Sequence, residues 1–340
     1  MISIVIKIQD VAKKAGVSTA TVSRVINGYE HVSDKLKNRV QDAIDELNYK
    51  PNQIAKSLAS QKTNLIGILV PDLKYEYYAN MLSSIEEYAS QKNYNIIVCN
   101  IKEDLDKEIR YINILKEMWV DGIILMHEKL NDNIKKLLLE CEIPTVLASI
   151  KLEGLDFPSV NIDDFKAAYD ATKYLIDLGH RKIAIIAGDM RDYTAGSERF
   201  RGYKQALVDN DIAFVPKYFG QGNFNIQDGY NAMGKLLENE IDLPTAVFAV
   251  SDSMAVGAMN YMIDRGYNVP DDISIIGFDD IDLASAVRPK LTTINQPAEK
   301  IGSLAVELLI KYIEKEYDEH DKEIVLEHRI VARGTCKELL

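Results

Sequence analysis

A segment near the amino terminus carries polar side chains at helical spacing. A helix over residues 19–27 would pack three apolar side chains inward, namely Val22, Val25 and Ile26. Its opposite face would then carry a short polar set, namely Ala20, Ser23, Arg24 and Asn27. An arginine on such a face can donate two hydrogen bonds to guanine O6 and N7. The pattern favours DNA recognition, and the alternative is a small, solvent-exposed bundle of three helices.

Three short helices are expected over residues 8–48. The first would end at Gly16, which can adopt the left-handed conformation that closes a helix at little cost. Ser18 is placed to cap the second helix and Ser33 the third. The third helix would turn its apolar side inward with Val40, Ile44 and Leu47. Helix, tight turn, helix and supporting helix is the plan of a helix-turn-helix domain.

Pro51 interrupts this pattern, and residues 52–60 form a two-turn amphipathic segment. Residues 61–64 have the composition of a linker. A helix this short with no packed core beside it is marginal in isolation. Its folding is therefore expected to depend on a partner.

The rest of the chain alternates short apolar runs with longer helical stretches. Strands are expected at 65–70, 95–99, 122–126, 145–148, 183–187, 246–250 and 273–277. Helices are expected near 77–92, 105–118, 131–140, 163–178, 197–210, 226–239, 252–265 and 297–316. Continuous apolar strands joined by helices indicate parallel sheets covered on both faces. There are too many strands for one compact sheet, so we expect two similar, doubly wound α/β lobes with a cleft between them.

The composition is close to the globular average, but the charge is unevenly distributed. The 340 residues are 47% hydrophobic and 27% charged, which suffices for a substantial core. The net charge of −12 divides into +4 over residues 1–63, with 10 Lys and Arg against 6 Asp and Glu, and −16 over the remainder. A basic head on an acidic body suggests that only the head meets a polyanion.

Several classes of protein are disfavoured by what the sequence lacks. No apolar run approaches the roughly 18 residues of a membrane span, and the run at 2–6 is too short for a signal peptide. The three cysteines cannot by themselves build a disulfide framework or a four-ligand zinc site. We expect a cytoplasmic protein with reduced thiols, no bound metal and no membrane contact.

Motifs for catalysis are also lacking. Gly220-Gln221-Gly222 misses the third glycine and the strand-to-helix context of a dinucleotide loop. The sequence contains no Gly-x-Ser-x-Gly elbow, no phosphate-binding Gly-Lys-Ser/Thr loop and no His-Glu-x-x-His, and its five histidines are scattered. We therefore expect neither enzymatic activity nor a cofactor.

Motifs along nearly the whole chain carry a family resemblance. The head contributes residues 10–28 (DVAKKAGVSTATVSRVING), 31–33 (HVS) and 47–52 (LNYKPN). The body contributes 121–124 (DGII), 178–184 (LGHRKIA), 251–257 (SDSMAVG), 276–280 (IGFDD) and 288–297 (RPKLTTINQP). Together they resemble the lactose-repressor/galactose-repressor (LacI/GalR) family of bacterial transcription regulators. The resemblance implies an all-α helix-turn-helix head on a core with the periplasmic-binding-protein-like fold, and an effector bound between its lobes.

The resemblance also implies which residues of the head meet double-stranded DNA. Thr19, Ala20 and Arg24 match the family's main readers of the major groove. Positions that touch phosphates or base edges are matched by Ser18, Thr21, Asn27 and His31.

Residues 52–60 match the family's hinge helix, with Asn52, Ala55 and Leu58 as its DNA-binding positions. Leu58 matches a leucine that inserts into the minor groove at a central CG step. This is physically sensible, because an apolar side chain can unstack a flexible pyrimidine–purine step. The alternative for Leu58 is packing between two hinge helices. Since the family binds as dimers, we expect a pseudo-palindromic operator, and we expect a homodimer because 334–340 leave no room for a tetramerising heptad tail.

In the body, Arg199 and Asp279 match the family's pocket arginine and carboxylate. Both suit a polyhydroxylated ligand, because a hydroxyl can donate to a carboxylate and accept from a guanidinium. Phe224 matches an aromatic residue that stacks on the ligand ring, and Gln296 is expected in a strand that crosses between lobes. The alternative for Arg199 and Asp279 is a salt bridge between the lobes.

The sequence departs from many relatives at the expected pocket. Ser251 stands where many have Asn. The loop at 74–78 reads Lys-Tyr-Glu-Tyr-Tyr, where many have Asn-Pro-Phe-Phe. Its three tyrosines, Tyr75, Tyr77 and Tyr78, would form a hydroxyl-rich aromatic wall, and the alternative is ordinary packing at a helix start. Ser149 is a further candidate for this wall, and the effector is expected to be a sugar or sugar phosphate.

These observations predict four parts of the chain. They are a DNA-binding domain at 1–50, a hinge and linker at 51–63, a first lobe at 64–161 with 293–325, and a second lobe at 162–292 with 326–340. The expected function is an effector-controlled repressor of carbohydrate-utilisation genes.

Two other functions are weighed against this one. In a catabolite-control-type regulator governed by a phosphorylated carrier protein, two basic residues lie where this chain has Glu307 and Lys311. An acid at Glu307 would repel a phosphoserine, which favours a small-molecule effector. The other function is a soluble sugar-binding protein, which leaves the head unexplained.

Overall fold

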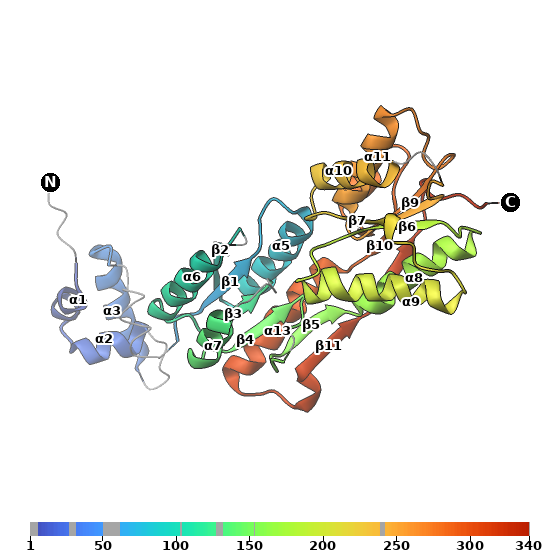
Figure 1. Cartoon of the computed structure of the whole chain (residues 1–340). Coiled ribbons are helices and arrows are strands. Elements are labelled where there is room, and N and C mark those ends of the chain that lie inside the picture. The colour runs from blue at the N-terminus through green and yellow to red at the C-terminus, as the bar shows by residue number, and fades with distance from the viewer. Residues whose placement is uncertain are drawn as a thin grey trace. The chain divides into compact units, whose positions relative to one another are not determined.

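The computed structural model describes residues 6–26, 32–49, 62–102, 104–126, 132–152, 154–238 and 242–339. The chain divides between Thr63 and Asn64 into two compact units, and each is described by itself (Figure 1). None of the helices in the described ranges combines the length and apolarity that a membrane crossing requires.

The amino-terminal unit contains α1 (Ile8–Ala15), α2 (Thr19–Ile26) and α3 (Asp34–Glu46). Each helix contributes one fully buried valine to a small shared core, namely Val11, Val22 and Val40. Gly16 ends α1 with a φ of +63°, as the sequence predicts. Arg39 of α3 donates a hydrogen bond to the Ala15 carbonyl at 2.6 Å, so the end of α1 is tied to the supporting helix.

One of the two predicted serine caps forms. The Ser18 hydroxyl accepts a hydrogen bond from the Thr21 N–H at 3.1 Å. Ser33 stands directly before α3, but its side chain makes no capping hydrogen bond, so that part of the prediction is wrong. The Ser33 carbonyl instead accepts from the N–H groups of Leu36 and Lys37, which starts the helix through the backbone alone.

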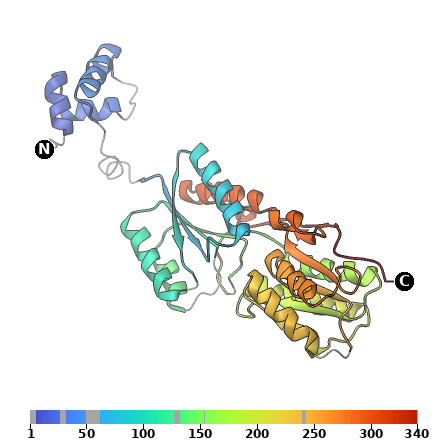
Figure 2. The same ribbon diagram turned by 90° about the horizontal axis from the view of Figure 1, so that it is seen from above.

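The first lobe of the core is a parallel sheet of six strands in the order β2-β1-β3-β4-β5-β11. Its strands are β1 (Leu65–Val70), β2 (Asn95–Asn100), β3 (Gly122–Leu125), β4 (Thr145–Ala148), β5 (Ser159–Ile162) and β11 (Glu323–Leu326). Its helices are α5 (Glu76–Gln91), α6 (Leu105–Glu117), α7 (Asp132–Glu140) and α13 (Ala298–Glu314). The pair α5 and α13 covers one face and the pair α6 and α7 the other (Figure 2).

The second lobe has the order β7-β6-β8-β9-β10-β12, parallel except for β12. Its strands are β6 (Ile183–Ala187), β7 (Phe219–Gln221), β8 (Ala246–Ala249), β9 (Ser274–Asp279), β10 (Thr292–Asn295) and β12 (Arg329–Val331). Its helices are α8 (Asp164–Asp177), α9 (Arg199–Asp209), α10 (Ile226–Leu237), α11 (Asp252–Asp264) and α12 (Asp282–Ala286). A π-helical turn at Tyr193–Glu198 precedes α9, and 3-10 turns lie at Pro216–Tyr218 and Glu319–Lys322.

The chain crosses between the lobes three times, after β5, after β10 and between β11 and β12. Each crossing lies one to three residues later than the sequence analysis places it. Ile162 pairs with Leu326 in the first sheet, and Thr293 to Asn295 pair with β9 in the second. The difference arises because β5 and β10 read Ser-Val-Asn-Ile and Thr-Thr-Ile-Asn, whose polar residues hide them from a search for apolar runs.

Candidate functional site

The polar face predicted for the second helix is formed by α2. Ser18, Thr19, Ala20 and Arg24 are exposed, Thr21 is partly buried, and Val22 points into the core. The hydroxyls of Ser18 and Thr21 lie 2.9 Å apart and hydrogen bond at the start of the helix. The other predicted DNA-binding residues lie outside the described residues, namely Asn27, His31, Asn52, Ala55 and Leu58.

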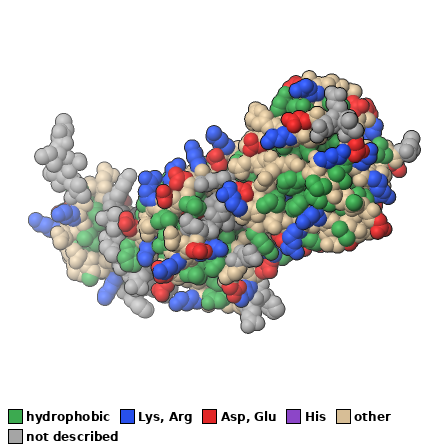
Figure 3. Space-filling view, in the orientation of Figure 1, with side chains coloured by type: hydrophobic (Ala, Val, Ile, Leu, Met, Phe, Trp, Pro, Cys, Tyr) green, Lys and Arg blue, Asp and Glu red, His purple; other side chains and the backbone are tan. Residues whose placement is uncertain are grey.

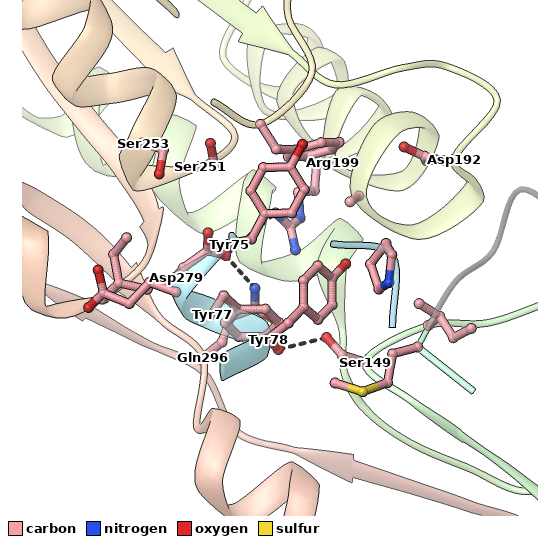
Figure 4. Close-up of a pocket in the computed structure, with 17 residues that line it drawn as sticks. Tyr75, Tyr77, Tyr78, Ser149, Asp192, Arg199, Ser251, Ser253, Asp279 and Gln296 are labelled. Carbon is pink, nitrogen blue, oxygen red and sulfur yellow. Dashed lines mark hydrogen bonds and ion pairs between the residues drawn. The ribbon is translucent and has the colours of Figure 1, made fainter. Parts of the chain in front are cut away.

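The core holds a cavity of about 80 Å³ whose walls come from both lobes (Figure 4). The structure brings all nine predicted residues of the core together there, namely Tyr75, Tyr77, Tyr78, Ser149, Arg199, Phe224, Ser251, Asp279 and Gln296. Eight more residues line it, namely Pro71, Glu76, Met126, Ile150, Asp192, Ala195, Ser253 and Ile281.

The lining residues lie at or beyond the carboxyl ends of strands in both sheets. In the first lobe they follow β1, β3 and β4, and in the second they follow β6, β7, β8, β9 and β10. Doubly wound sheets bind ligands at this edge, where neighbouring crossovers run to opposite faces and leave a crevice. The position of each residue relative to its strand was therefore the signal that could have found the eight unpredicted residues.

Arg199, the first residue of α9, is held on several sides by the second lobe. Its Nε donates to Asp164 Oδ1 at 2.8 Å, and one terminal nitrogen donates to the Val250 carbonyl at 2.8 Å. Its guanidinium carbon lies 3.7 Å from the ring centroid of Phe278, and one terminal nitrogen lies 3.8 Å from Asp279 Oδ1. Arg199 and Asp279 both belong to the second lobe, so the alternative of a salt bridge between lobes is wrong. Asp164, at the start of α8, is the direct partner that sequence reasoning missed.

Asp279 ends β9 with a φ of +117°, and its side chain lines the cavity. Its Oδ1 accepts from the Gln296 amide at 2.7 Å. Burial raises the pKa of the Asp279 carboxyl to about 7, although the charge of Arg199 and the bond from Gln296 pull it down. The carboxyl therefore titrates near neutrality.

A second buried carboxylate lies behind this wall. Asp252 accepts from the Thr293 hydroxyl at 2.5 Å and from the Ile281 N–H at 3.0 Å. Burial and the neighbouring Asp279 charge raise its pKa. Ser251, directly before it, caps α11 by accepting from the Met254 N–H at 3.2 Å.

The Tyr77 hydroxyl links the first lobe to the crossing segment that follows β10. It lies 2.6 Å from the Ser149 hydroxyl and donates to Gln296 Oε1 at 3.1 Å (Figure 4). Burial raises the Tyr77 pKa above its ordinary value, so the group stays a neutral donor. Because Gln296 also bonds Asp279, a continuous chain of polar contacts runs from Ser149 to Asp279. The predicted hydroxyl-rich wall is present here, and Tyr77 is also packed into the core.

The other aromatic residues complete the wall from both sides. Tyr75 donates to the Asn223 carbonyl of the second lobe at 3.2 Å. Next to it, Phe224 takes a φ of +58° and lies over Gly188, where an added Cβ would come within 2.4 Å of the ring. The ring can occupy this place only because residue 188 is glycine.

Comparison with known proteins places these features in a family. Residues 7–52 match the bacterial regulatory proteins of the lacI family, and residues 172–336 match a periplasmic binding protein-like domain. Catabolite control protein A of Priestia megaterium is 40% identical over 333 residues, which cover 98% of this chain and 99% of that protein. The chain belongs to the LacI family. It is therefore a DNA-binding transcriptional regulator with a helix-turn-helix head and a two-lobed α/β core.

Solved structures of LacI-family proteins share its architecture. The lac repressor dimer bound to operator and the anti-inducer ONPF has a TM-score of 0.87 at 28% identity, with 97% of this chain and 98% of that chain covered. The complex of the regulator CelR with cellobiose has a TM-score of 0.75 at 31% identity, with 97% and 100% covered.

The two positions weighed for a carrier-protein contact are both engaged within the first lobe. Glu307 on α13 accepts from the Tyr88 hydroxyl at 3.3 Å. Lys311, one turn later, forms a 2.7 Å salt bridge with Asp321. This stretch of α13 therefore presents a paired lysine beside two acids.

Proposed function

We propose that this LacI-family regulator is a cytoplasmic, dimeric repressor whose affinity for its operator is set by a small polyhydroxylated effector in the cleft. The observation that carries the proposal is the chain of polar contacts from Ser149 through Tyr77 and Gln296 to Asp279. A ligand that replaces any of these contacts binds one arrangement of the lobes better than another. Such differential binding is what couples an effector to a second site.

The proposal assigns DNA recognition to α2 and binding without catalysis to the cleft. Thr19, Ala20 and Arg24 supply the main base contacts, and phosphates or base edges are contacted by Ser18, Thr21, Asn27 and His31. Replacing Arg24 with Ala should cost about 1–3 kcal/mol on an operator selected from a randomised DNA pool. It should also relax discrimination at one base pair. An equal loss on random DNA would remove the base-reading role.

The remaining assignments concern the hinge and the dimer. Residues 52–60 act as the hinge, Asn52 and Ala55 face the DNA, and Leu58 inserts at a central CG step of a pseudo-palindrome. The lac repressor structure, a dimer bound to operator, supports the symmetric arrangement. Light scattering should give a dimer, and changing the central CG step should weaken binding of the full chain far more than that of a Leu58→Ala variant.

A second candidate function is control by a phosphorylated carrier protein. The similarity to catabolite control protein A favours it. The two acids beside Lys311 count against it, because Glu307 and Asp321 would repel a phosphoserine.

The deciding experiment is a thermal-shift panel on the purified full chain, followed by an operator titration with each stabilising compound. A ligand at about 100 times its dissociation constant adds about 2.7 kcal/mol of stability, which a melting curve detects. A compound that stabilises the protein and shifts operator binding supports the proposal. Operator binding that responds only to a phosphorylated carrier protein supports the second candidate.

A further inference from the structure

The charged side chains that line the cavity are mostly acidic. Glu76, Asp192 and Asp279 supply carboxylates, and Arg199 supplies the only positive charge among the described lining residues. Two cations on neighbouring loops are paired elsewhere, since Lys151 forms a salt bridge with Glu323 and Arg191 with Asp189. Among the described residues, the cavity wall therefore carries more acidic than basic side chains.

The positive charge of Arg199 is balanced before any ligand arrives. The side chain is 5% exposed and donates to Asp164, which is itself 5% exposed and lies behind the wall. A further N–H is taken by the Val250 carbonyl. An arginine binds a phosphate most tightly through a free edge that donates two parallel hydrogen bonds. The Nε edge of Arg199 is occupied by Asp164, so only its remaining N–H groups can meet a ligand.

Helix starts beside the cavity are compensated in the same way. An amino-terminal helix end attracts anions through its free N–H groups. Here Glu76 lies in the first turn of α5 and also accepts from the Asp282 N–H of α12 at 2.7 Å. Asp252 lies in the first turn of α11, whose Met254 N–H is already bonded to Ser251. Acidic side chains thus occupy the places where a phosphate group would be held.

The aromatic side chains of the wall favour a positively charged ligand. The rings of Tyr75 and Tyr78 lie 6.3 Å apart between centroids, and those of Tyr77 and Tyr78 lie 5.5 Å apart. Aromatic faces attract cations, and a carboxylate nearby strengthens the attraction. On the face of the core shown in Figure 3, the described basic and acidic side chains are interspersed.

From this charge distribution we infer that the effector carries no negative charge, and that the cleft prefers an amine-bearing polyol to the same polyol bearing a phosphate ester. The inference rests on the proposed function, since it names the class of ligand that the cleft takes. It also narrows the expectation from the sequence, which left sugars and sugar phosphates open.

The test uses sets of compounds that share one sugar ring. Each set contains the neutral sugar, its 2-amino form and its 6-phosphate, beginning with glucose, galactose and mannose, and inorganic phosphate serves as the anion control. Binding to the full chain is measured by thermal shift and calorimetry at pH 7.5. In any set that contains a binder, we expect the amino form to bind at least about tenfold more tightly than the phosphate. A phosphate that binds best, beyond inorganic phosphate alone, overturns the inference and leaves the proposed function standing.

Two variants test whether the named carboxylates cause the preference. Asp279→Asn removes one charge, and Glu76→Gln removes another while its amide oxygen can still accept from the Asp282 N–H. Each should lower the amine-to-phosphate ratio about tenfold, whereas Asp106→Asn, an exposed acid on α6, should leave it unchanged. Ratios that follow net charge alone, with Asp106→Asn equal to the others, overturn the inference. No binder of any class, with operator binding intact, counts against the proposed function itself and removes the inference with it.

Discussion

In the first lobe, most residues that reach the cleft are uncharged: three tyrosines after β1, Met126 after β3 and Ser149 after β4. In the second lobe, the corresponding strand ends supply Asp192, Arg199 and Asp279, with Asp164 and Asp252 buried behind them. Yet the strand order is the same from edge to edge apart from the reversed last strand. The architecture decides where ligand-facing residues stand, and the loops decide what chemistry they offer.

This difference assigns separate tasks to the lobes. Buried charges are costly unless they are paired, so the second lobe must hold Arg199 and its acids in one geometry with or without a ligand. The hydroxyls of the first lobe are neutral and can exchange partners at lower cost. We therefore expect the second lobe to select the effector and the first lobe to report its arrival.

The largest effect is expected from removing the buried guanidinium. Arg199→Ala leaves Asp164 and Asp279 without their cation, and breaking a buried pair in this way costs about 3–5 kcal/mol. Denaturant unfolding of the full chain measures the loss. Arg201→Ala, on the same helix but 56% exposed, is the matched control and should lose less than about 1 kcal/mol. Equal losses for the two arginines would mean that the buried pairs of Arg199 add nothing to the stability of the second lobe.

The next effect is a change in how stability depends on pH. The pKa of Asp279 is about 7 in the folded protein and near 3.8 when exposed, so the folded state holds its proton more tightly. This group therefore stabilises the protein least above pH 7, and its contribution falls as pH rises from about 4 to about 7. Asp279→Asn should remove that fall, and the variant should gain on the wild type across this window, by a few kcal/mol at most.

Melting curves at half-unit pH steps check this sign, with Asp106→Asn as the control. A wild-type protein that gains on Asp279→Asn as pH rises from 4 to 7 would mean that Arg199 outweighs burial at this site. Asp279 would then stabilise the second lobe as an ionised partner of Arg199, and the prediction that it is a destabilising buried acid would be wrong.

The sequence predicts most elements of the core because their strands are continuous apolar runs. β1, β4 and β6 lie where the residue pattern places them. β7, β11 and β12 escape the pattern because they have only three or four residues and lie at the sheet edges, where polar residues are tolerated. β5 escapes it although it lies inside its sheet, because Ser159 and Asn161 interrupt its short apolar run. The π-helical turn before α9 was also missed, since no local pattern distinguishes it from helix.

Some residues of the site can be found from the sequence, and the role of others depends on contacts that form only in the folded protein. All nine predicted core residues line one cavity. Arg199, Phe224, Asp279 and Gln296 were found through the family resemblance, and the others through their position in loops that follow strands. Asp164 and Asp252 were missed because they do not line it, and their part depends on contacts between residues 35 and 41 positions apart. Sequence reasoning finds nine of the seventeen lining residues but neither of the buried acids behind them.

A smaller effect is expected on the neutral side of the cleft. Tyr77→Phe keeps the packed ring and removes bonds to Ser149 and Gln296, at about 1 kcal/mol for each bond. Stability should fall by about 1–2 kcal/mol, and the effector should shift operator binding less. Ser149→Ala removes one of the two bonds and should show about half the loss. A Tyr77→Phe variant with full stability and full response would show that packing alone explains this tyrosine.

The smallest effect is expected from Tyr75→Phe, and this variant most directly separates ligand preference from the response of operator binding. Tyr75→Phe removes a partly buried bond to the Asn223 carbonyl in the other lobe, so stability should fall by only about 0.5–1 kcal/mol. Because the bond joins the lobes without touching Arg199 or Asp279, ligand preference should be unchanged while the response of operator binding weakens. Calorimetry with the best ligand and an operator titration measure the two properties separately. If preference changes together with response, the two lobes do not divide their tasks, and the tyrosines belong to the same selective surface as the buried charges.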